Sequence, residues 1–295
     1  LISPVFRGFQ GELENVYEEK NRSADGSGDA MEKIMGAVFK TQPYAYSVLG
    51  STESLKNPRL SDMEAFFRKF YVAPNMCLIL SGDLPQGSLL PLLEKTFGRV
   101  QGGAVPERSK SSIPPFTPGE QAEIKLPIPI VKAEALVWRA PTDYESDADV
   151  LDLANRLLSN DKAGMLDSLT NEHAVLMAAA MHVAMNDAGV TALFFVPKLL
   201  GKLKKAETLV LAQLDRLMQG DFTEEQLELQ KQDLLLEMER GIETLEGRAD
   251  RMIDVYSQGR TWQDYLDRIE RIRSVTKADA YGDLLADILG GGAVA

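Results

Sequence analysis

The spacing of apolar side chains predicts a chain made mostly of helices. Apolar residues recur at intervals of three and four in many segments, as they do on one face of an α-helix. These segments cover residues 12–22, 30–39, 61–70, 88–97, 147–158, 203–218, 222–239, 239–259 and 265–289. Shorter apolar runs bounded by turn residues predict strands over residues 76–80, 122–131, 132–140 and 191–197. This mixture of helices and strands predicts an α+β protein.

Several of these segments are expected to be buried. The helix near residue 61 has the spacing of a capping box, with Ser61 as N-cap and Glu64 three residues later. Its apolar stripe is expected in the core and consists of Met63, Phe66, Phe67 and Phe70. The strand over residues 76–80 is expected to be buried together with Cys77. The next helix is expected to bury one side through Leu89, Leu90, Leu92 and Leu93.

Residues 101–119 separate two units of the chain. This stretch is rich in proline, glycine and serine, which is typical of a semi-extended linker. We therefore predict one unit over residues 1–100 and a second over residues 120–295. The order of segments in residues 222–289 follows the same plan as residues 53–71, which indicates two copies of one fold.

Composition excludes two kinds of partner. The 295 residues include 44 acidic and 32 basic side chains, which gives a formal net charge of -12. An acidic surface does not neutralise phosphates, so nonspecific nucleic-acid binding is excluded. The chain lacks an apolar run of about 18 residues that could span a membrane, so we expect a soluble protein. The sequence does not decide between the cytoplasm and a bacterial periplasm. One cysteine, Cys77, excludes an internal disulfide framework.

One short run combines acidic side chains with a helical spacing. In a helix over residues 12–22, Glu12, Asn15, Val16 and Glu19 lie on one face over two turns. Two carboxylates about 10 Å apart along the axis can serve a cation or orient its other ligands. A solvated acidic face explains the same pattern, because runs of charge usually face water.

The segments that follow this run carry a family resemblance. They contain, in order, Gln42-Pro43-Tyr44, Val48-Leu49-Gly50, Leu60-Ser61-Asp62-Met63-Glu64, Phe70-Tyr71-Val72-Ala73-Pro74 and Leu78-Ile79-Leu80-Ser81-Gly82-Asp83. In order and spacing, these motifs resemble the second half of a catalytic domain of the pitrilysin-type (M16, insulinase-like) zinc peptidases. The resemblance implies two homologous α/β domains of mixed sheet packed with helices, the first of them incomplete.

The resemblance also implies a chemistry. Members of this family are zinc metalloendopeptidases that enclose unfolded peptides in a chamber of repeated domains. Two histidines of an inverted H-x-x-E-H helix and a downstream glutamate hold the metal, and Glu19 resembles that glutamate. Glu12 resembles a companion glutamate that orients a ligand without touching the metal. The zinc would activate a water molecule, and the glutamate of the motif would take its proton.

The chain departs from the family because H-x-x-E-H is absent. Its two histidines, His173 and His182, lie nine residues apart without an adjoining Glu-His, so both are expected at ordinary polar positions. The corresponding helix of the second unit reads Leu151-Asp152-Leu153-Ala154-Asn155. Residues 120–295 therefore resemble the noncatalytic partner domain. Residues 1–100 resemble the C-terminal half of the catalytic domain, and we interpret the chain as a fragment without the upstream half.

These interpretations give a concrete expectation. The isolated chain is expected to bind no zinc and to cleave no peptide bond, since one carboxylate is not a zinc site. Zinc, the upstream half-domain, a second M16-type half and a peptide substrate are expected partners of the full-length parent. One alternative is a noncatalytic scaffold or peptide-recognition subunit, whose acidic surface attracts basic peptides. Another is an unrelated helical module that binds partners through the amphipathic helices from Leu203 onward.

Overall fold

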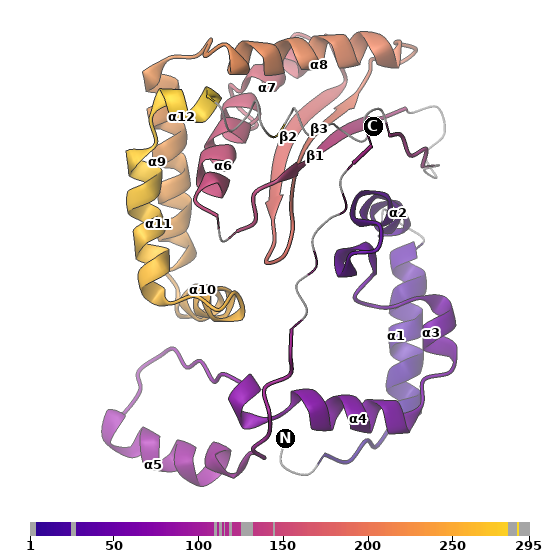
Figure 1. The fold of residues 1–295 in the computed structure, drawn as a ribbon, viewed down its shortest axis with the longest axis vertical. Helices are drawn as coiled ribbons and strands as arrows, with labels where there is room; N and C mark the ends of the chain where they lie inside the picture. Colours follow the sequence, from indigo (N-terminus) through magenta and orange to yellow (C-terminus); the bar gives the residue numbers. More distant parts are fainter. Residues whose placement is uncertain are drawn as a thin grey trace.

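The protein is a helix-rich α+β structure with one small sheet (Figure 1). The computed structural model describes residues 4–24, 28–108, 111, 114, 116–117, 120–124, 132–143, 145–282 and 288. The α+β class expected from the sequence is confirmed. The three described strands pair only antiparallel, whereas the family resemblance implies a mixed sheet.

Most of the predicted helices form in the expected order. The first hundred residues contain α1 (Phe9–Ala24), α2 (Gly28–Phe39), α3 (Thr52–Lys56), α4 (Leu60–Phe70) and α5 (Gln86–Thr96). The strands are β1 (Glu134–Ala140), β2 (Met177–Ala184) and β3 (Gly189–Val196). The remaining helices are α6 (Asp147–Leu158), α7 (Met165–Asn171), α8 (Leu203–Met218), α9 (Glu224–Gly241), α10 (Leu245–Ser257), α11 (Trp262–Ser274) and α12 (Lys277–Tyr281). Of these elements, α3, α7 and β2 lie outside the predicted segments.

Strand β3 lies between β1 and β2 and divides the buried residues into two clusters. Side chains alternate between the two faces of a strand, so neighbours in sequence enter different clusters. The main core contains the face formed by Leu136, Trp138, Ala178, Leu193 and Phe195, together with residues of α6 to α12. On the opposite face, Val137, Val190 and Ala192 lie in a smaller cluster with Phe39 of α2 and with Phe116.

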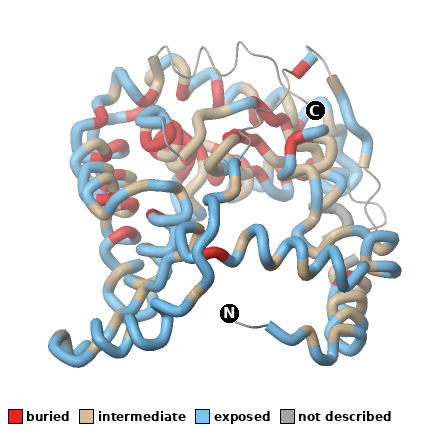
Figure 2. The backbone as a smooth tube through the Cα atoms, turned by 60° about the horizontal axis from the view of Figure 1, so that its bottom comes forward, coloured by how far each residue is buried: buried red, intermediate tan, exposed pale blue. Residues whose placement is uncertain are grey.

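Most residues of the first unit are exposed, as Figure 2 shows. Before position 100, the buried apolar side chains among the described residues are Val38, Phe39 and Val72. The prediction of a buried stripe on α4 is therefore wrong, and Phe66 is 56% exposed. The aromatic rings of α4 contact one another, with Phe66 and Phe70 centroids 4.5 Å apart. The burial predicted for α5 is also wrong, because Leu90 and Leu92 are exposed.

Two local predictions in this unit fail as well. Helix α4 begins two residues earlier than expected, with Arg59 instead of Ser61 as N-cap and without a side-chain cap, so Ser61 does not form a capping box. Residues 76–80 form no strand, and Cys77 is exposed. The apolar run has strong strand propensity, but a strand needs a neighbour that takes its hydrogen bonds. Within the described part of the chain, residues 77–80 have no backbone partner of that kind.

The predicted linker contacts the first unit. Gln42 Nε2 donates to the carbonyl of Ser111 at 3.3 Å, and Lys40 Nζ lies 2.8 Å from the Glu120 carboxylate. Phe116 is buried. Of the strand predicted over 122–131, residues 125–131 lie outside the described part, and residues 122–124 form no strand. The boundary at 101–119 stays a prediction.

Threonine caps divide the C-terminal helices. The sequence analysis expects helical segments within residues 265–289. In the structure α11 ends at Ser274, and Thr276 starts α12 with a capping box. Thr261 starts α11 in the same way. In both boxes an aspartate three residues later accepts hydrogen bonds from the threonine, namely Asp264 and Asp279.

These caps predict a dependence of stability on pH. A backbone hydrogen bond from Thr261, followed by its side-chain hydrogen bond, lowers the pKa of Asp264 below its ordinary 3.8. A carboxyl with a lower folded-state pKa stabilises the fold above that ordinary value, and the contribution is lost as the pH falls through the folded-state pKa. We expect Asp264→Asn to lower the unfolding temperature at about pH 6, and we expect this effect to shrink as the pH falls below 3.8, measured by circular dichroism. Asp267→Asn, which removes a carboxylate outside the cap, is the control, and a pH-independent difference for Asp264→Asn would contradict the expectation.

Candidate functional site

The two glutamates singled out in the sequence lie on α1, which forms as predicted. Gly8 has a left-handed φ of 71° immediately before this helix, and Glu12 lies in its first turn, where it complements the helix dipole. Glu12 and Glu19 are both exposed. Lys20 is buried and forms an ion pair with Glu32 of α2, which fixes a side of α1 about a quarter turn away from Glu12 and Glu19. The acidic face is thus left accessible on an anchored helix.

The residues around Glu19 do not form a zinc site by themselves. Zinc takes three or four protein ligands from histidine, cysteine, aspartate or glutamate. Within the described part of the chain, no group of three such side chains is placed to hold a metal ion. The assignments of Glu19 as a ligand and of Glu12 as its companion therefore stay predictions.

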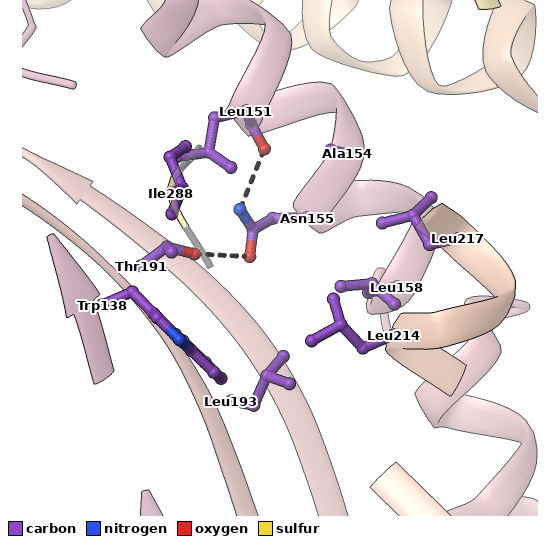
Figure 3. A pocket seen from close by; sticks show the side chains of 10 residues that line it. All are labelled: Trp138, Leu151, Ala154, Asn155, Leu158, Thr191, Leu193, Leu214, Leu217 and Ile288. Carbon is purple, nitrogen blue, oxygen red and sulfur yellow. Dashed lines mark hydrogen bonds between the residues drawn. The ribbon is translucent and has the colours of Figure 1, made fainter. Parts of the chain in front are cut away.

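The helix that the family resemblance matches with the H-x-x-E-H helix is α6, and its inward face is closed by packing (Figure 3). A small hollow beside it is lined mostly by apolar side chains, including Trp138, Leu151 and Leu214. The polar lining groups satisfy each other, because Asn155 Nδ2 donates to the Leu151 carbonyl at 2.9 Å and Thr191 Oγ1 donates to Asn155 Oδ1 at 3.2 Å. This face of α6 offers packing and no metal ligand.

The outer side of α6 carries an ionic cluster that the sequence analysis did not identify. Its members are Asp149, Asp152, His182, Arg268 and Arg271. Arg268 lies 2.6 Å from Asp149 and 3.1 Å from Asp152, and Arg271 lies 3.2 Å from Asp149. Asp152 is also 2.7 Å from His182 Nδ1, whose ring is 1% exposed. The cluster joins α6 to α11 and to strand β2.

The electrostatics of this cluster support a structural role. Burial alone lowers the pKa of Arg268, but the charges of Asp149 and Asp152 and the hydrogen bond to Asp149 outweigh it, so the pKa is raised. His182 Nε2 lies 3.2 Å from the Pro141 carbonyl, so both ring nitrogens have partners. His173 lies in an exposed turn, as expected, whereas the side chain of His182 is almost fully buried. The matching intervals of three residues, Asp149 with Asp152 and Arg268 with Arg271, are the signal that sequence analysis could have used.

A family model described as "Peptidase M16 inactive domain" matches residues 59–234. Among known proteins, the zinc protease PqqE of Helicobacter pylori is 22% identical over 270 residues. That match covers 86% of this chain and 59% of the relative, so the chain spans less than two thirds of the relative's length. No helix in the described part of this chain is long and apolar enough to cross a membrane.

Two solved structures have the same fold. A protease from Helicobacter pylori matches with a TM-score of 0.85 at 19% identity, over 99% of this chain and 72% of that one. A peptidase M16 inactive domain from Pseudomonas fluorescens matches with a TM-score of 0.79 at 15% identity, over 96% of this chain and 69% of that one. At such identities the similarity concerns the fold alone.

Proposed function

Because the chain belongs to the family of peptidase M16 inactive domains, we propose that it is the noncatalytic part of a zinc-dependent endopeptidase. In this proposal, residues 120–295 are a supporting domain that helps to hold an unfolded peptide substrate. Residues 1–100 complete a catalytic domain whose metal-binding histidines belong to another polypeptide segment. Glu19 adds one carboxylate to that metal site, and Glu12 orients the ligands.

The observation that carries the proposal is the exposed acidic face of α1. Glu12 and Glu19 lie two turns apart on a helix whose adjacent side is fixed by the Lys20–Glu32 ion pair. A carboxylate held on an anchored helix can enter a site assembled with other ligands without rearrangement of its own backbone. The closed face of α6 supports the other half of the proposal, since a supporting domain needs a packed interior and no metal ligands there.

The apolar segment over residues 76–80 supports an association with further polypeptide. The backbone of residues 77–80 has no backbone hydrogen-bond partner within the described part of the chain, and Leu78 and Leu80 are exposed. Apolar side chains directed to both sides are typical of a strand inside a sheet. A neighbouring strand from the rest of a peptidase would satisfy these backbone groups and cover these side chains.

The test compares Glu19→Gln with Glu14→Gln, which removes an exposed carboxylate from a different face of α1. Each variant is recovered with its natural assembly through a tag on this chain, and zinc content and cleavage of an unfolded peptide are measured. We expect Glu19→Gln to weaken zinc binding about 100-fold and to lower cleavage with it, because a direct ligand is lost. Glu14→Gln is expected to behave as the wild type. An assembly that contains no zinc, or in which both variants cleave normally, would contradict the proposal.

The isolated chain provides a second test. We expect equilibrium dialysis to detect no stoichiometric zinc on it, since a single carboxylate cannot compete with water and buffer for the ion. The measurement uses zinc at micromolar concentrations with and without a chelator. Tightly bound zinc that is removed by the chelator and lost in Glu19→Ala would show that the chain holds a complete site by itself.

A noncatalytic scaffold or peptide-recognition subunit is the second candidate. The absence of a three-ligand cluster among the described residues favours it, because no metal is needed to explain the acidic face. In that case Glu12 and Glu19 form a solvated surface that attracts basic peptides. A natural assembly without zinc that binds basic peptides, with affinity lowered equally by Glu14→Gln and Glu19→Gln, would establish this candidate.

A further inference from the structure

The connection between β3 and α8 exposes two leucines at its tip. We call this connection together with the first residues of α8, residues 197–205, the Leu199 loop. Leu199 is 74% exposed and Leu200 93% exposed. Leu200 has a left-handed φ of 62°, which leucine seldom adopts. Gly201 allows the turn to close, since a Cβ there would lie 2.8 Å from the Lys198 carbonyl. The backbone is therefore shaped in a way that holds two apolar side chains out in water.

Lysines surround these leucines in a protein that is acidic overall. Lys198, Lys202, Lys204 and Lys205 belong to the loop, and no acidic residue occurs between Gly189 and Ala206. All four lysines are exposed. Lys204 pairs with Glu207, whereas Lys198, Lys202 and Lys205 form no ion pair within the described part of the chain. The loop is thus a local basic surface on a chain of net charge -12.

The N-terminus of α8 adds to the positive electrostatic potential of this basic surface. Lys202 is the N-cap of this helix and makes no side-chain capping bond, and the first turn contains no acidic residue. The positive end of the helix dipole normally attracts acidic side chains. The other described helices of the second unit longer than one or two turns follow that rule, as in α6, α9, α10 and α11. In α8, lysines lie where a negative charge would be stabilised.

We propose that the Leu199 loop docks the protein on an anionic lipid surface. The two leucines enter the boundary between headgroups and acyl chains, and the lysines with the start of α8 contact lipid phosphates. The loop lies at one edge of the molecule, where α8 begins (Figure 1), so the contact does not require other elements to move. The acidic remainder of the surface is repelled by the same lipids and orients the molecule with this loop toward them.

A lipid surface fits the leucines better than a peptide does. Peptide recognition places apolar side chains of the ligand in hollows of the protein. Here Leu199 and Leu200 border a hollow together with Leu176, but the greater part of their own surface is open to water. Insertion of such a tip into a bilayer boundary removes that surface from water without a complementary groove.

The experiment is co-sedimentation of the full chain with vesicles. One set contains equal parts of phosphatidylglycerol and phosphatidylcholine, and the other contains phosphatidylcholine alone. We expect binding to the anionic vesicles that falls with added salt, and about 100-fold weaker binding to the neutral ones. Leu199→Ser with Leu200→Ser is expected to weaken the binding about tenfold or more. Lys198→Glu with Lys202→Glu is expected to abolish it at moderate salt.

Two control variants separate this loop from the rest of the surface. Leu245→Ser changes an exposed leucine at the start of α10, and Lys56→Glu reverses the charge of an exposed lysine at the end of α3. Both are expected to bind anionic vesicles as the wild type does, and circular dichroism confirms that each variant is folded. Absence of wild-type binding to anionic vesicles would overturn the proposal. Equal losses in the loop and control variants would do the same, as would capture of acidic peptides by the loop without vesicle binding.

Discussion

Replacing Phe195 with alanine is expected to lower the free energy of unfolding by about 4 kcal/mol. Phe195 is fully buried in the central strand β3 and belongs to the main core. Truncation of a buried phenylalanine removes its contacts and leaves a cavity, which the surrounding helices fill only in part. Equilibrium unfolding in urea, followed by circular dichroism, measures this change.

The neighbouring residue provides a matched control. Phe194 has the same side chain in the same strand but lies on the opposite face, where it is only partly buried. We expect Phe194→Ala to cost about half as much as Phe195→Ala, since less surface leaves water on folding. Equal costs for the two variants would contradict the description of one face as the main core and the other as a minor cluster.

The sequence predicts the bounds of helices better than it predicts which of their faces are buried. Helices α6 and α8 were predicted with their observed bounds, because their apolar spacing and their neighbouring turn residues are local signals. The burial of α4 and of residues 76–80 was predicted wrongly, because burial depends on which other segment covers a side chain. The α4 stripe has the same periodicity whether or not a partner lies on it. Periodicity therefore predicts which side of a helix is apolar, but it does not predict whether another segment packs on that side.

The candidate site was predictable to different degrees. Glu12 and Glu19 lie on one exposed helical face, as their spacing predicts, but their chemical roles stay predictions because ligation depends on groups distant in sequence. His182 was expected at an ordinary polar position, and the structure places it in the ionic cluster of α6 and α11. Its partner Asp152 is thirty residues away in sequence, and Arg268 is more distant still. Such pairings follow from tertiary packing, which local spacing does not encode.

The ionic cluster gives the other large expected effect. Replacing Asp149 with asparagine is expected to lower the free energy of unfolding by about 3 kcal/mol. The Asp149 side chain is 4% exposed and accepts from Arg268 at 2.6 Å and from Arg271 at 3.2 Å. The amide removes the negative charge and leaves two cations beside each other, with Arg268 retaining only Asp152. Removal of one member of a buried ion pair is costly because the remaining charge has lost its solvent and its partner.

Asp147→Asn is the control for this prediction, because Asp147 is also in the first turn of α6 but is exposed. Its loss is expected to cost about 0.5 kcal/mol, through the helix dipole alone. A third variant, Asp149→Asn combined with Arg268→Met, separates the ion pair from the packing of Asp149. If the loss of stability in Asp149→Asn arises from an unpaired buried cation, the double variant is expected to regain part of it, because the unpaired Arg268 guanidinium has been removed. A double variant that loses the sum of the two single effects would show that Asp149 stabilises α6 independently of α11.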